Sequence, residues 1–254
     1  MRGYAFLQEL GIPENTPALH SEEDLNKRIS KIRTDLSKYY KVENLDRQSA
    51  QTSLEKALQG CHALIEQYRG CGEAYLIRGV VHDEKNEWTA AIKDLREAHA
   101  HHIPRAGEKL AQVYSKQGQH QYNQWYDTLE NPVFLEEAEN NFSKAIELLP
   151  SRASFYFARG IVRDVQGQTK SAYNDLTKAL ELDPNHEPSA FARGCMYLRH
   201  GMFREALKDL AHALNHCTNA ENKKNIQEAL RYTAAGVPMN MPRIKLNLEK
   251  TYTT

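Results

Sequence analysis

The chain of 254 residues lacks any apolar run long enough to cross a bilayer as a helix. It also lacks an excess of either charge, because 33 Lys and Arg residues balance 33 Asp and Glu residues. A neutral chain has no broad electrostatic attraction for nucleic acid or anionic lipid. Its first residues lack the apolar core of a secretory signal peptide. We therefore expect a cytoplasmic protein with no membrane span and no nucleic-acid partner.

Signatures of catalytic, cofactor and metal sites are missing as well. There is no Gly-rich phosphate loop, no nucleophile elbow and no HExxH motif. Two His-rich stretches, at 99–102 and 212–217, lack further ligands at metal-binding spacing. Four cysteines have no CxxC spacing and are expected to be reduced thiols: Cys61, Cys71, Cys195 and Cys217. The sequence therefore predicts a non-enzymatic protein without metal or cofactor.

The chain does contain an internal repeat, marked by an Arg-Gly pair and an Asp sixteen residues after the Arg. A Leu follows each Asp, and an Ala stands four residues beyond it. The clearest copy covers 153–186, and the next begins thirty-four residues later. The three Arg–Asp pairs are Arg78 and Asp94, Arg159 and Asp175, and Arg193 and Asp209. Self-similarity at a fixed period predicts stacked units that build an extended binding surface.

Within each copy the residue types suit two antiparallel helices. Small residues such as Gly160 and Ala172 stand where two helix backbones must approach closely, and large residues such as Leu176 fill the gaps. A glycine between the helices can adopt positive φ, and a proline ends the second helix. The period and these offsets resemble the tetratricopeptide repeat family. The resemblance implies an all-α, right-handed superhelical solenoid of antiparallel helix pairs.

The resemblance covers 72–218 and divides it into four repeats. These are 72–103, 104–152 with an insertion at about 119–134, 153–186 and 187–218. In the second repeat Leu110 replaces the Arg and Asn141 replaces the Asp. Because both partners vanish together, we predict that the Arg and Asp of the other repeats form structural salt bridges. The alternative is an arginine that binds an anionic ligand.

The flanking segments follow their own patterns. Residues 1–20 are predicted to be an N-terminal arm. Residues 21–71, with Ser21 as a helix N-cap, form either a helical hairpin that caps the solenoid or a degenerate repeat. Residues 219–235 are predicted to be a C-terminal capping helix. The last segment, 236–254, alternates apolar and polar residues and is predicted to be an extended tail, either flexible or docked.

In this family peptides lie along the concave face, which the first helices line. When the chain is aligned with the repeat of this family, twelve of its positions are expected to line that groove. They are Leu76, Val80, Asp83, Glu84, Gln112, Phe157, Ile161, Asp164, Phe191, Cys195, Leu198 and Arg199. The C-terminal half of this set is apolar, which suits an apolar or amphipathic peptide of another protein. The chain's own tail, such as 239–244, is an alternative occupant, and a register error would instead make these positions inter-repeat packing.

Two further features bear on the partner. The clamp with which some relatives capture chaperone C-termini is incomplete, because Ala158 and Ser189 occupy its Asn and Lys positions. The insertion carries Tyr122, Trp125, Tyr126 and Phe134. These aromatic residues either pack inside a lengthened helix pair or form a projecting partner site.

The sequence thus predicts a non-enzymatic scaffold or adaptor that binds a peptide segment in the groove. The alternative is a structural subunit of a larger assembly, such as ciliary or secretion machinery, which uses the convex face and the insertion. A third possibility is an enzyme accessory or small-ligand binder.

Overall fold

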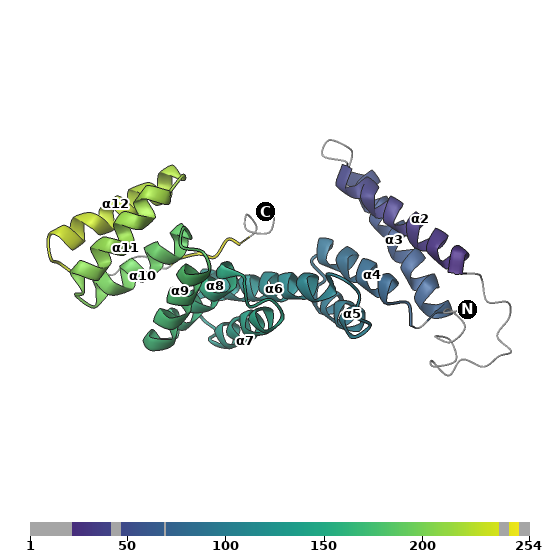
Figure 1. Ribbon diagram of the computed structural model, residues 1–254, viewed down its shortest axis with the longest axis horizontal. Helices are drawn as coiled ribbons and strands as arrows, with labels where there is room; N and C mark the ends of the chain where they lie inside the picture. The colour runs from purple at the N-terminus through teal and green to yellow at the C-terminus, as the bar shows by residue number, and fades with distance from the viewer. Residues whose placement is uncertain (1–21, 42–46, 69, 239–243, 249–254) are drawn as a thin grey trace. The chain divides into compact units, whose positions relative to one another are not determined.

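The computed structural model describes the chain except for residues 1–21, 42–46, 69, 239–243 and 249–254 (Figure 1). The predicted N-terminal arm, the Ser21 cap and residues 239–243 of the tail therefore lie outside the described residues. None of the described helices is long and apolar enough to cross a membrane. The helices are α2 (Glu22–Lys41), α3 (Arg47–Gln67), α4 (Gly72–Glu84), α5 (Trp88–Ala100), α6 (Ala106–Thr128), α7 (Val133–Leu148), α8 (Ala153–Val165), α9 (Thr169–Leu182), α10 (Glu187–Arg199), α11 (Phe203–His216) and α12 (Ala220–Ala234).

Consecutive helices pack in pairs: α2 with α3, α4 with α5, α8 with α9 and α10 with α11. Three of these pairs turn through a residue with left-handed backbone at the same repeat position. Gly167 has φ 77° and Gly201 has φ 71°, whereas Asn86 takes this conformation with φ 59°. Glycine adopts such angles without steric cost, and asparagine tolerates them better than most residues. The prediction of an all-α chain is confirmed for the described residues.

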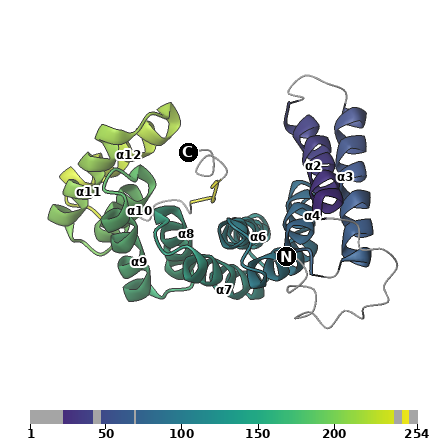
Figure 2. The same ribbon diagram turned by 45° about the vertical axis from the view of Figure 1, so that its right-hand side comes forward.

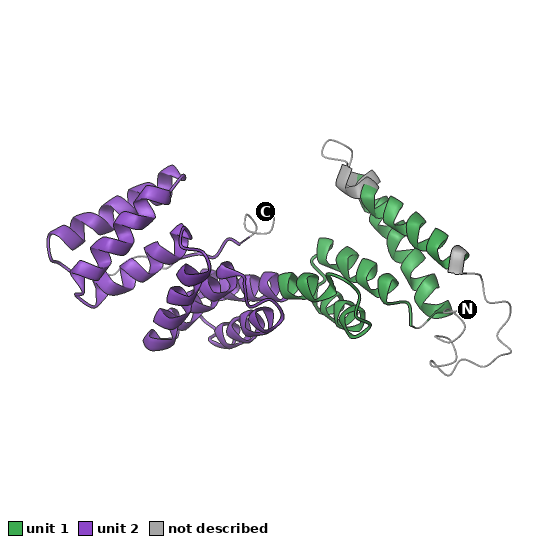
Figure 3. Ribbon diagram, viewed as in Figure 1, with its two compact units in different colours: residues 1–113 green, residues 114–254 purple. Residues whose placement is uncertain are grey.

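The described residues divide into two compact units, with the boundary at Val113 and Tyr114 inside α6 (Figure 3). Unit 1 ends at Val113, and unit 2 begins at Tyr114. In unit 1 the hairpin of α2 and α3 shares a hydrophobic core with α4. The buried residues of that core include Ile29, Ile32, Leu54, Ala57, Cys61, Leu64, Ala74, Ile77 and Val81.

The segment predicted to be an insertion, 119–134, contains the end of a long helix. α6 has 23 residues, whereas α8 and α10 have 13 each. α6 ends before Leu129, whose φ is 57°, and Asn131 Oδ1 then accepts a hydrogen bond from Val133 N at 3.1 Å. In the added turns Tyr122 and Trp125 are buried and belong to the largest hydrophobic cluster of unit 2. The extra residues thus extend both the helix and its packing surface.

That largest cluster joins helices α6 to α10 with the end of the chain. Besides Tyr122 and Trp125, it contains Phe142 of α7, Leu176 of α9 and Met196 of α10. Its C-terminal members are Leu246 and Leu248, which lie far beyond α12 in sequence. Leu246 and Leu248 are therefore part of the core of unit 2.

Candidate functional site

Each predicted Arg–Asp pair makes two hydrogen bonds from one guanidinium to one carboxylate. The donors are Nε and Nη2 in every case, at distances between 2.6 and 2.9 Å. The pairs are Arg78 with Asp94, Arg159 with Asp175 and Arg193 with Asp209. This bidentate geometry is among the strongest a guanidinium can make. The Arg forks join the two helices of a repeat and point at protein carboxylates.

The pair of the third repeat belongs to a larger network. Asp175 also accepts a hydrogen bond from Arg163 Nη1 at 2.9 Å, and Arg163 Nε donates to Glu139 Oε1 at 2.8 Å. In the second repeat, which lacks the Arg and Asp, Asn141 Nδ2 donates instead to Gln121 Oε1 at 2.7 Å. A neutral hydrogen bond therefore replaces the ion pair there.

The predicted groove positions of unit 1 are partly exposed. Leu76, Val80, Asp83 and Glu84 lie along α4, and Gln112 lies on α6. Partial exposure leaves these side chains accessible for contact with a partner.

The predicted groove positions of α8 lie in the core of unit 2. Phe157 and Ile161 are each only 5% exposed, in the same hydrophobic cluster as Leu246 and Leu248. The two charged positions pair with each other, because Arg199 Nη2 lies 2.8 Å from Asp164 Oδ2. These two charged groove positions thus neutralise one another.

The remaining groove positions, on α10, are packed beneath the last helix. Cys195 and Leu198 are buried in a cluster with Leu210 of α11 and Ala229 of α12, and Phe191 packs against it. Burial raises the pKa of the Cys195 thiol to about 12, so it remains protonated and unreactive near neutral pH. These positions serve the packing of α12.

A short stretch of the chain's end lies on α6. We call residues 244–248 the tail segment; it is drawn in yellow near α6 and α8 (Figures 1 and 2). Tyr122 Oη donates to the Ile244 carbonyl oxygen at 2.8 Å, and Asn123 Nδ2 donates to that of Leu246 at 3.0 Å. The Leu248 N–H donates to Gln119 Oε1 at 2.6 Å. We call the three α6 side chains Gln119, Tyr122 and Asn123 the α6 clamp.

The side chains of the tail segment alternate between core and solvent. Leu246 and Leu248 are each 2% exposed and Ile244 is half-buried, whereas Lys245 and Asn247 are exposed. Successive side chains of an extended chain point to opposite sides, so one face of the segment is apolar. The α6 clamp holds the backbone while this apolar face enters the core of unit 2.

One charged contact accompanies the tail segment. Lys245 Nζ lies 2.6 Å from Asp127 Oδ1 and 5.5 Å from the ring centroid of Tyr126. About half of each charged side chain is exposed to solvent. Exposed ion pairs contribute about 0.2–1 kcal/mol, so this contact adds selectivity more than affinity.

The twelve predicted groove positions do not include the residues that contact the tail segment through polar groups. Gln119, Asn123 and Asp127 lie within 119–134, where the predicted alternative of a partner site rests on the aromatic residues alone. A signal was present, because Gln119, Asn123 and Asp127 follow one another at four-residue spacing on one helix face. The period-two pattern of the tail was the matching signal.

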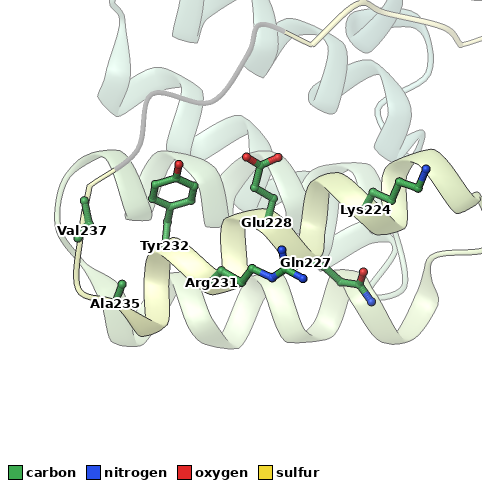
Figure 4. A pocket seen from close by; sticks show the side chains of 7 residues that line it. All are labelled: Lys224, Gln227, Glu228, Arg231, Tyr232, Ala235 and Val237. Atoms are coloured by element: carbon green, nitrogen blue, oxygen red, sulfur yellow. The ribbon is translucent and has the colours of Figure 1, made fainter.

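A separate hollow of about 680 Å³ opens beside α12 (Figure 4). Along it Lys224, Glu228 and Tyr232 stand in a row on one face of the helix. Its complete lining is Lys224, Gln227, Glu228, Arg231, Tyr232, Ala235 and Val237. Charges of both signs alternate there, which gives no consistent field for an anion or a cation.

Among the described residues, no three His, Cys, Asp or Glu side chains are placed to hold a metal ion together. The four cysteines are free thiols. Burial raises the pKa of Cys61 to about 12, so this thiol too stays protonated at neutral pH.

Comparison with known proteins agrees with the repeat and the fold. The family model of the tetratricopeptide repeat matches residues 153–186. A MamA double mutant, RS-1 ArsTM, has a similar structure with a TM-score of 0.51, 15% identity, and coverage of 74% of this chain and 94% of its own. PilF of Pseudomonas aeruginosa has a TM-score of 0.51, 16% identity, and coverage of 83% of this chain and 90% of its own. No curated protein matches the chain in sequence.

Identities at this level show a shared fold and nothing finer. The matched segment contains the Arg159–Asp175 pair and the Gly167 turn. The chain therefore contains a tetratricopeptide repeat at 153–186, and its described residues have an all-α fold of helix pairs similar to these structures.

Proposed function

We propose that the protein is a non-enzymatic interaction scaffold whose working surface is the α6–α8 face that carries the tail segment. This surface binds a peptide in extended conformation. The observation that supports the proposal is the docking of residues 244–248 through three backbone hydrogen bonds and two buried leucines. Because the α6 clamp contacts backbone atoms, it accepts any extended segment whose apolar residues recur at every second position.

The contacts suit a weak, exchangeable ligand. Burying two leucine side chains contributes about 3–6 kcal/mol, and three hydrogen bonds contribute about 1.5–4.5 kcal/mol. Association costs at least about 4 kcal/mol in lost freedom of motion. At most about 6.5 kcal/mol remains, which corresponds to a dissociation constant on the order of 10 μM at the tightest for a separate peptide.

The residues at the family's clamp positions do not support binding of an acidic chaperone C-terminus. Ala158 and Ser189 are fully buried. Arg193 is engaged by Asp209 and also donates to Thr177 Oγ1 at 3.0 Å. A carboxylate ligand would have to displace these bonds.

In unit 1 we propose a partner contact at the exposed parts of Leu76, Val80, Asp83, Glu84 and Gln112.

A second candidate function is that of a structural subunit, favoured by exposed apolar residues at the α6–α7 turn. Leu129 is 54% exposed and Val133 is 48% exposed. A subunit that docks through this turn loses its partner on the double change Leu129→Ser and Val133→Ser. It keeps its partner when the α6 clamp is altered.

The test of the peptide-binding proposal uses the full chain with an opened tail. In Leu246→Asp/Leu248→Asp the two buried leucines become charged, which expels the tail segment from the core. A fluorescent peptide with the sequence of residues 243–250 is titrated against this variant, and anisotropy is measured. We expect saturable binding that weakens at least about tenfold when Gln119→Ala and Asn123→Ala are added, since two backbone hydrogen bonds are lost. Absence of saturable binding up to about 1 mM would exclude this surface as a peptide site.

A further inference from the structure

We infer that the tail segment is a built-in competitor that keeps the α6–α8 surface closed. An outside ligand must displace it and must share its chemistry: an extended segment with Leu-like residues at alternate positions and a cation just before the first buried leucine. This inference rests on the proposed function and adds its regulation and its ligand class.

The first argument is that two unusual features of the chain fit each other. The α6 clamp and Asp127 lie in the turns by which α6 exceeds α8 and α10 in length. The alternation of Ile244, Leu246 and Leu248 belongs to the tail segment alone. A first helix of ordinary length would offer the tail segment none of its three hydrogen bonds. The added turns of α6 and the tail segment therefore act together, because the former supply the hydrogen-bonding groups that bind the latter.

The second argument concerns the strength of the closed state. Only six residues, 238–243, separate Val237 from the tail segment. A short tether of this kind gives an effective concentration on the order of 1 mM. If the free peptide binds with a dissociation constant of about 10 μM, the surface is closed in about 99% of molecules. An outside ligand then binds about a hundredfold more weakly than it binds the open surface.

The third argument concerns which ligands compete. The α6 clamp contacts three backbone atoms, so it selects an extended conformation and not a side chain. Side-chain selection comes from the sites of Leu246 and Leu248, which are almost fully buried. Lys245, which stands between Ile244 and Leu246 in sequence, places its ammonium group near Asp127 and Tyr126. Since this ion pair is half exposed, the cation changes affinity by a few-fold.

The test compares three full-length proteins with the labelled peptide of residues 243–250. They are the unaltered chain, the opened variant Leu246→Asp/Leu248→Asp, and the control Asn247→Asp, which changes only an exposed position. We expect the unaltered chain and the control to bind the peptide at least about tenfold more weakly than the opened variant. Circular dichroism checks that all three keep the same helix content.

The outcomes separate the two proposals. Equal binding by the unaltered chain and the opened variant would refute the inference that the tail segment competes with outside ligands. It would leave the proposal of peptide binding intact. No binding to either protein would overturn the proposed function, and the competitor with it.

A second measurement needs no opened variant. Excess unlabelled peptide added to the unaltered chain should accelerate amide hydrogen exchange at Leu248, whose N–H is held by Gln119. Unchanged exchange at saturating peptide would overturn the competitor. A peptide with Glu in place of the lysine at position 245 should bind the opened variant about two- to fivefold more weakly, and Asp127→Lys should reverse that order. Equal binding of the two peptides would overturn the cation preference.

Discussion

Single residues hold the helix pairs of this protein in register. The carboxylate of Asp175 is buried and accepts hydrogen bonds from both Arg159 and Arg163. A buried carboxylate without a partner is costly, so each such Asp admits only the arrangement of helices that brings its Arg into place. Repeating this pair along the chain repeats the geometry of the hairpin.

Another residue makes the fold sensitive to pH. The ring of His186 lies 5.5 Å from that of Phe157, and its Nδ1 lies 2.8 Å from Ser189 Oγ. Burial lowers the pKa of His186 below the ordinary value of 6.5, and only Asp183 opposes that shift. The unfolded chain therefore binds the proton more readily than the folded chain. The stability linked to His186 is present above pH 6.5 and is lost as the pH falls through 6.5 towards the lower folded pKa.

We expect His186→Gln to reduce the pH dependence of unfolding. Between about pH 7.5 and pH 5 the urea midpoint of the unaltered chain should fall more than that of the variant, because only the former must protonate His186 on unfolding. Identical slopes for the unaltered chain and His186→Gln would contradict the assignment.

At the scale of elements, close contact between paired helices depends on a glycine. A Cβ atom added at Gly79 would lie 2.7 Å from Leu95 Cγ, whereas one added at Gly160 would lie 3.2 Å from Leu176 Cγ. These glycines occupy the same position in two repeats. The two distances therefore differ because the helices of one pair lie slightly closer together than those of the other. Overpacking destabilises a core, and the cost rises with the displacement it forces.

We therefore expect Gly79→Ala to destabilise the protein by about 1–3 kcal/mol. Gly160→Ala should cost less, because the neighbouring leucine has to move only slightly and alanine favours the helix by about 1 kcal/mol over glycine. Differential scanning calorimetry of the two variants compares their melting temperatures. A larger loss for Gly160→Ala than for Gly79→Ala would show that the spacing of the helices does not govern the cost.

At the scale of the whole molecule, the end of the chain stabilises one unit. Leu246 and Leu248 belong to the core of unit 2, and every polar contact described for the tail segment is also made within unit 2. Unit 1 has its own core of α2, α3 and α4. Changes in the tail segment should therefore affect the two units unequally.

We expect Leu246→Asp/Leu248→Asp to raise amide hydrogen exchange in 114–165 and to leave 47–67 unchanged. The reason is that the tail segment packs on α6 and the α8 cluster, whereas α3 belongs to unit 1. The exposed control Asn247→Asp should change neither region. Equal acceleration in both regions would mean that the two units do not open separately.

Much of the fold could be predicted because each repeat encodes its own packing locally. Arg78, Arg159 and Arg193 stand a constant sixteen residues from their aspartates, and that spacing is enough to predict a helix pair. The residues of the candidate site were harder to predict from the sequence than the fold. Phe157, Ile161, Cys195 and Leu198 form a single apolar set in the sequence, but the structure covers them with different elements, the tail segment and α12.

The sequence by itself determined the helix pairs, their turns and the partners of the repeated arginines, because these contacts join residues within one period of the repeat. Only the tertiary structure decided where the tail segment lies. Its bond from Tyr122 to Ile244 spans 122 residues, and no repeat period encodes a contact at that separation. The apolar alternation of the tail segment required a surface to cover, and the folded arrangement of α6 and α8 provides that surface on unit 2.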